Sequence, residues 1–66
     1  MEKASIIIKK ILVEKNMKQN EVSNYLGISP QNFANKLSRN TFSFDDFSKI
    51  LDFLGYEIEI IKKSEN

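Results

Sequence analysis

A helix stop and a helix start lie within residues 27–30, and this constrains the fold more than any other feature of the sequence. Gly27 follows a short amphipathic segment, and glycine is favoured directly after a helix because it adopts a positive φ without steric cost. Ser29 and Pro30 match the preferred N-cap and first residue of a new helix. The sequence therefore predicts helices over residues 19–26 and 30–39, separated by about three residues.

Two further helices are predicted on either side of this pair. The first covers about residues 3–15 and ends at Asn16, and the fourth covers about residues 43–54, between an N-cap at Ser43 and a stop at Gly55. The helical period predicts the buried positions to be Ala4, Ile7, Ile8, Ile11, Val22, Tyr25, Leu26, Phe33, Leu37, Phe44, Phe47, Ile50, Leu51 and Leu54.

The sequence after the fourth helix changes to an alternating pattern. Over residues 56–61, Tyr56, Ile58 and Ile60 fall on one side and polar residues mostly on the other, which is typical of a strand. A single strand cannot satisfy its own backbone groups, so it needs a partner. We therefore expect one all-α domain over residues 1–66, with four helices and a short C-terminal β-strand.

The composition argues against several classes of function. The chain has no Cys and no His, which removes disulfides, thiolate metal sites and the commonest general base. Asp45 and Asp46 are explained as charges at the start of a helix. The apolar run over residues 6–8 is interrupted by Lys9 and Lys10, so it is too short for a membrane span. We expect a cytoplasmic protein that has no catalytic residues and binds no metal, cofactor, small-molecule ligand or membrane.

The outward side of the predicted helix 30–39 has an unusual composition. Phe33 and Leu37 lie within about 40° of one another and are expected to face the core. An arc of about 140° on the other side holds amides and bases, namely Gln31, Asn32, Asn35, Lys36 and Arg39. Asn and Gln can pair with adenine edges, and Arg or Lys with guanine. Since ordinary solvated faces usually mix Glu with Lys, the absence of acids favours DNA reading over a plain surface.

Charge is distributed unevenly along the chain. Residues 1–40 carry seven basic and three acidic side chains, a net charge of +4, whereas residues 41–66 carry three basic and six acidic ones, a net charge of −3. One half is therefore suited to face phosphates. Lys18 and Gln19, at the start of helix 19–26, are candidate phosphate contacts because a helix N-terminus attracts anions. The alternative is that both are surface residues without a partner.

Residues 17–29 resemble the signature of a known family. They read Met-Lys-Gln-Asn-Glu-Val-Ser-Asn-Tyr-Leu-Gly-Ile-Ser, similar to the pattern Leu-Thr-Gln-x-x-Leu-Ala-x-x-Leu-Gly-Ile-Ser of the Cro and phage-repressor (Xre-type) helix-turn-helix family. The resemblance continues into residues 47–55 and covers roughly residues 6–56. It implies a phage or prokaryotic transcriptional regulator that binds double-stranded DNA with helix 30–39 in the major groove.

The resemblance and the residue chemistry together predict the DNA contacts. The base-reading residues are predicted to be Gln31, Asn32, Asn35 and Lys36. The contacts to the DNA backbone are predicted to be Lys18, Gln19, Arg39, Asn40 and Thr41. Lys18 departs from the pattern because it replaces the usual Thr cap, and loss of such a cap typically costs about 1 kcal/mol.

The family resemblance also suggests a partner for the strand. Some small members of the family form symmetric dimers by strand pairing, so we expect a homodimer through the strand over residues 56–61. Its interface is predicted to include Phe53, Tyr56, Ile58 and Ile60, with the apolar seam of Ile6 and Val13 also available. The strand could instead fold back on the first helix or remain a frayed tail. The alternative function is a protein-interaction or antitoxin-like module, which the net charge of +1 and the acidic second half favour.

Overall fold

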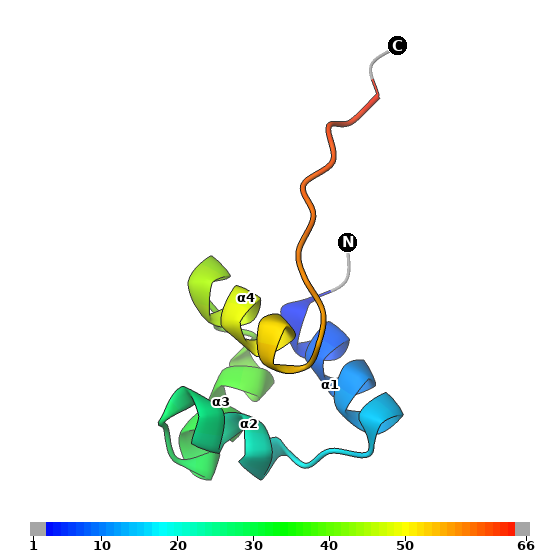
Figure 1. Ribbon diagram of the computed structural model, residues 1–66. Helices are drawn as coiled ribbons and strands as arrows, with labels where there is room; N and C mark the ends of the chain where they lie inside the picture. Colours follow the sequence, from blue (N-terminus) through cyan, green and yellow to red (C-terminus); the bar gives the residue numbers. More distant parts are fainter. Residues whose placement is uncertain (1–2, 65–66) are drawn as a thin grey trace.

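Four helices pack around one core in the computed structural model, which describes residues 3–64 (Figure 1). They are α1 (Ala4–Lys15), α2 (Gln19–Leu26), α3 (Pro30–Arg39) and α4 (Phe44–Phe53). These bounds agree with the predicted helices to within one residue. α2 and α3 lie side by side, and both contact α1 or α4.

All four described helices end in the same backbone motif. A residue with a positive φ follows each helix, directly after α1, α2 and α3 and two residues after the end of α4. The φ values are 55° at Asn16, 74° at Gly27, 54° at Asn40 and 89° at Gly55. At Gly27 this conformation lets its N–H donate to the Asn24 carbonyl at 3.2 Å and the next N–H donate to the Ser23 carbonyl at 3.1 Å. This is the Schellman arrangement, which satisfies carbonyls that the helix itself leaves unpaired. The predicted stops are confirmed.

The two predicted serine caps are also confirmed. The Ser29 hydroxyl accepts a hydrogen bond from the Asn32 N–H at 3.1 Å, and the Ser43 hydroxyl accepts one from the Asp46 N–H at 3.1 Å. Pro30 stands at the first position of α3, where its missing N–H costs nothing. The end of α2 and the start of α3 together fix the short connection over residues 27–29.

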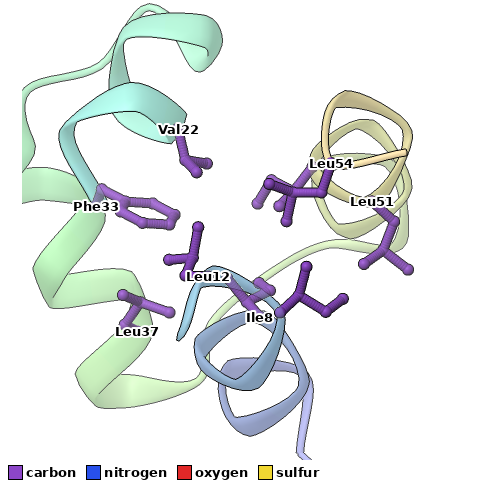
Figure 2. Packing of buried hydrophobic residues seen from close by; sticks show 9 residues of the cluster. Ile8, Leu12, Val22, Phe33, Leu37, Leu51 and Leu54 are labelled. Atoms are coloured by element: carbon purple, nitrogen blue, oxygen red, sulfur yellow. The ribbon is translucent and has the colours of Figure 1, made fainter. Parts of the chain in front are cut away.

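The core is formed by apolar side chains from all four helices. Figure 2 shows Phe33 lying beside Val22 and Leu12 in the centre of this cluster. The buried members among residues 3–64 are Ile8, Ile11, Leu12, Val22, Phe33, Leu37, Ile50, Leu51 and Leu54. Phe33 is fully buried, and its ring packs edge-on against that of Phe42, with the ring centroids 6.0 Å apart. Ser23 is also fully buried, and its hydroxyl donates to the Asn20 carbonyl at 3.0 Å.

Two residues that were predicted to be buried are exposed, and one apolar residue is buried without having been predicted so. Phe44 is 63% exposed, because it belongs to the first turn of α4, where the apolar stripe runs past the edge of the core. Tyr25 is 45% exposed and stacks on Phe53 at the surface. Leu12, which was not predicted to be buried, is 4% exposed, because it lies one helical turn after the buried Ile8.

The predicted C-terminal strand over residues 56–61 is wrong, and the described chain is all-α. None of residues 3–64 forms a β-ladder. The extended segment over residues 56–64 contacts the helical body through Tyr56 and Ile58 and then runs away from it (Figure 1). The connections between helices, over residues 16–18, 27–29 and 40–43, are too short to pair with it. Without a partner strand, its backbone groups cannot form a ladder.

We predict that Gly27→Ala destabilises the domain by about 1–2 kcal/mol, the cost of placing a Cβ atom in the left-handed region. A Cβ atom at Gly27 would have no neighbour within 4 Å, so the loss is conformational and not steric. Gly27→Asn is the control, since Asn tolerates a positive φ and should lose less. Urea unfolding measures both, and equal losses for Ala and Asn would contradict this explanation.

Candidate nucleic-acid interface

Four of the five amides and cations that were predicted on the outward side of α3 are exposed. Phe33 and Leu37 face the core, with exposed fractions of 0% and 4%. Asn35 lies about 180° around the helix from the midpoint between them. The exposed amides and cations of this helix are Gln31, Asn32, Asn35 and Arg39. No carboxylate lies on α3, so the surface offers hydrogen-bond donors and positive charge without like-charge repulsion toward a polyanion.

Lys36 lies closer to the protein core than the other candidate residues of α3. It is half-buried, about 80° from the midpoint of the buried side. Its side chain lines a shallow pocket between α2 and α4 whose other residues are Tyr25, Leu26, Ile28, Asp46 and Lys49. The ammonium group can leave such a pocket while its carbon stem remains packed. Base reading by Lys36 stays a prediction, and the structure places the residue at the flank of the surface.

Two exposed residues of α3 were missed by the sequence analysis. Ala34 and Ser38 are exposed on the flank opposite Lys36, about 80° and 120° from the midpoint of the buried side. Neither residue is an amide or a cation, the two side-chain types on which the prediction for this helix was based. Their angular positions would have identified them. Ala34 allows close approach of a ligand, and the Ser38 hydroxyl can donate or accept a hydrogen bond.

The start of α2 presents an exposed lysine and glutamine beside free backbone N–H groups. Lys18 and Gln19 are both exposed, and the Lys18 side chain makes no cap. The unpaired N–H groups and the helix dipole favour an anion at this end. A carboxylate already lies there, because Glu21 Oε2 accepts a hydrogen bond from the Lys18 N–H at 3.0 Å. The predicted phosphate site therefore combines one cation with one anion.

The connection after α3 contains the remaining predicted backbone contacts. Arg39 and Thr41 are exposed. The side-chain oxygen of Asn40 is directed toward α1, where it accepts hydrogen bonds from both the N–H and the hydroxyl of Ser5, each at 3.0 Å. Contact of Asn40 with DNA stays a prediction, and its oxygen is already engaged within the fold.

Three of the four predicted dimer-interface residues have partners within the chain. Phe53 stacks on Tyr25 with ring centroids 4.4 Å apart. The Tyr56 hydroxyl donates to Glu14 Oε1 at 2.6 Å, and Ile58 packs partly against the core. Ile60 is 86% exposed. The dimer interface stays a prediction, but strand pairing no longer supports it.

Residues 3–64 contain no group of three His, Cys, Asp or Glu side chains that could hold a metal ion. Within the same residues, no helix combines the length and the apolar character that crossing a bilayer requires.

Comparison with known protein families gives one match. Residues 8–60 match the family model described as the Cro/C1-type HTH DNA-binding domain. The matched region runs from α1 through α4 and includes all of α2 and α3. No curated protein and no solved structure matches the chain.

We predict that Glu14→Gln lowers the pKa of Tyr56. The hydrogen bond to Glu14 raises the pKa of the Tyr56 hydroxyl above its ordinary value of 10.0, with desolvation and the Glu14 charge adding to the shift. The folded state therefore holds this proton more tightly than the unfolded chain. The resulting stabilisation is present below the unfolded pKa and is lost as the pH rises through the folded value. Absorbance titration of phenolate in a Tyr25→Phe background isolates Tyr56, and an unchanged pKa in Glu14→Gln would contradict the assigned contact.

Proposed function

The chain belongs to the Cro/C1-type helix-turn-helix DNA-binding family, and from this premise we propose that it is a sequence-specific transcriptional regulator of a phage or prokaryote that reads double-stranded DNA with α3. The observation that carries the proposal is the exposed, acid-free side of α3, which has Asn35 at its centre and is anchored from behind by Phe33 and Leu37. Two large apolar side chains on one side leave the opposite side free for a ligand.

The dimensions and chemistry of α3 suit the major groove. The groove is about 12 Å wide and admits a helix of about 10–12 Å diameter. Asn35, Gln31 and Asn32 carry amides that can pair with adenine through its N6 and N7 positions. A good bidentate contact of this kind discriminates against the wrong base by about 1–3 kcal/mol. We assign sequence choice to this set of amides.

Contacts to the DNA backbone supply the affinity in this proposal. The cations predicted to contact the backbone are Lys18, at the start of α2, and Arg39, at the end of α3, and the neutral donors beside them are Gln19 and Thr41. Two neutralised phosphates give a slope of log K against log salt of about −2 per chain. Measuring the affinity for random duplex DNA over a range of salt concentrations tests this slope. Binding that is absent or insensitive to salt would overturn DNA binding and favour the protein-interaction or antitoxin-like alternative.

Regulation by this protein is proposed to be passive occupancy. A bound copy near a promoter blocks or recruits polymerase. Two copies on a near-palindromic site would place their recognition helices about 34 Å apart, one turn of DNA. Selection of bound sequences from a random duplex pool tests both parts, since symmetric enriched sites would support paired copies and asymmetric ones would favour a single copy.

We predict that Asn35→Ala and Lys18→Ala have different effects on DNA binding. Asn35→Ala should relax the preference at one base pair, by about 1–3 kcal/mol if the contact is bidentate, and leave the salt dependence unchanged. Lys18→Ala should weaken all sequences alike and reduce the salt slope by about 1. Titrations of the selected site and of random duplex separate the two, and identical behaviour of the variants would refute the assigned roles.

A further prediction concerns the carboxylate at the start of α2. Glu21→Gln keeps a hydrogen-bond acceptor for the Lys18 N–H and removes a negative charge from the proposed phosphate site. We expect affinity for any duplex at low salt to rise by up to about fivefold, the size of an exposed charge pair, and the gain to shrink as salt is added. Asp52→Asn, on α4, is a control that removes the same charge from another helix. An equal gain from both variants would show an effect of net charge alone.

A further inference from the structure

The side chain that ends α3 also caps the start of α1. Asn40 Oδ1 accepts hydrogen bonds from the N–H and from the hydroxyl of Ser5, which lies 35 residues earlier in the chain. Lys3, the residue before α1, makes no cap, because a lysine ammonium group has no lone pair to accept an N–H. Asn40 therefore performs a function that the sequence next to α1 does not provide.

Both hydrogen bonds satisfy groups that would otherwise be unpaired. Ser5 is the second residue of α1, and an N-cap side chain normally bonds the N–H at the second or third position. Ser5 is only 5% exposed, so water has little access to its hydroxyl. One amide oxygen has two lone pairs and can accept both donors.

The backbone of the same residue completes the end of α3. Asn40 has a φ of 54°, its N–H donates to the Leu37 carbonyl at 3.3 Å, and the Thr41 N–H donates to the Lys36 carbonyl at 3.1 Å. Asn tolerates this left-handed conformation and also carries an acceptor, whereas Gly would provide the conformation alone. Asn40 thus joins the C-terminal end of α3 to the N-terminal end of α1.

This link restrains α3 in a way that its apolar contacts do not. Phe33 and Leu37 hold the helix against the core, but the hydrophobic effect is not directional and permits some rotation about the helix axis. A pair of hydrogen bonds at one end of α3 is directional. Rotation of α3 would move Asn35 and Arg39 around the helix axis and away from their positions on the outward side.

We propose that Asn40 is a positioning residue for DNA reading, acting through Ser5 to fix the orientation in which α3 presents its outward side. This inference rests on the proposed function. It differs from a direct phosphate contact by Asn40, which would not involve Ser5.

The test compares the affinity for the selected site with that for random duplex, at a temperature where circular dichroism shows every variant folded. Loss of folded protein lowers both affinities alike, whereas a misoriented α3 lowers their ratio. Asn40→Gly keeps the backbone conformation and removes the oxygen, and we expect the ratio to fall by about fivefold, the equivalent of one lost cap. Ser5→Ala removes one of the two donors and should give a smaller fall in the same direction.

Two further variants sharpen the comparison. Asn16→Gly is the matched control, because Asn16 ends α1 in the same motif at a φ of 55°. No residue of the described chain hydrogen-bonds the Asn16 side chain, so this substitution should leave the ratio unchanged. Asn40→Asp keeps the acceptor for Ser5. This variant should therefore retain most of the parent's ratio of selected-site to random-duplex affinity, even though its charge weakens binding to every duplex.

The outcomes are distinct. An unchanged ratio in both Asn40→Gly and Ser5→Ala, with the parent still preferring its selected site, would overturn the positioning role alone. A fall in Asn40→Gly that Ser5→Ala does not share, and that Asn40→Asp does not reverse, would identify Asn40 as a direct DNA contact and also overturn it. A parent protein that binds no duplex in a salt-dependent manner would refute the proposed function and the inference with it.

Discussion

Burial of Phe33 is the interaction on which the rest of the structure depends. Its side chain is fully enclosed beside Val22 and Leu12, so one residue joins α3 to both α2 and α1 (Figure 2). A domain of about this size buries only about 60% of its unfolded surface, so each large core side chain carries a substantial share of the stability. Because Phe33 and Leu37 fix the inner side of α3, they also determine which residues of that helix face outward.

Charge reinforces this division of the molecule. Within residues 41–64, the acidic side chains lie on α4 and on the C-terminal segment, which runs away from α2 and α3 (Figure 1). α3 carries no acid, and Glu21 is the acidic residue of α2. A net charge of +1 is therefore compatible with a DNA-binding surface, since attraction to phosphate depends on the local arrangement of charge and not on the total.

The sequence by itself determined the four helices, their ends and the inward side of α3. Gly27 and Asn16 end helices, and Ser29 starts one, through hydrogen bonds to residues at most five positions away. Such signals are complete within a short stretch of sequence, so the helix bounds were predicted to within one residue. Phe33 and Leu37 are four residues apart, and the helical period alone places them on one side. The composition of the opposite side, and with it the candidate site, followed directly.

The tertiary structure alone decided which surfaces are covered and which segments pair. Phe44 has the correct angular position for burial but lies beyond the edge of the core, and Tyr25 finds its partner at the surface. The alternating residues 56–61 satisfy the local pattern of a strand but have no neighbouring segment to pair with. The hydrogen bonds between Asn40 and Ser5 join residues 35 positions apart. Burial, strand pairing and caps of this kind depend on segments distant in the chain, whose approach no local pattern specifies.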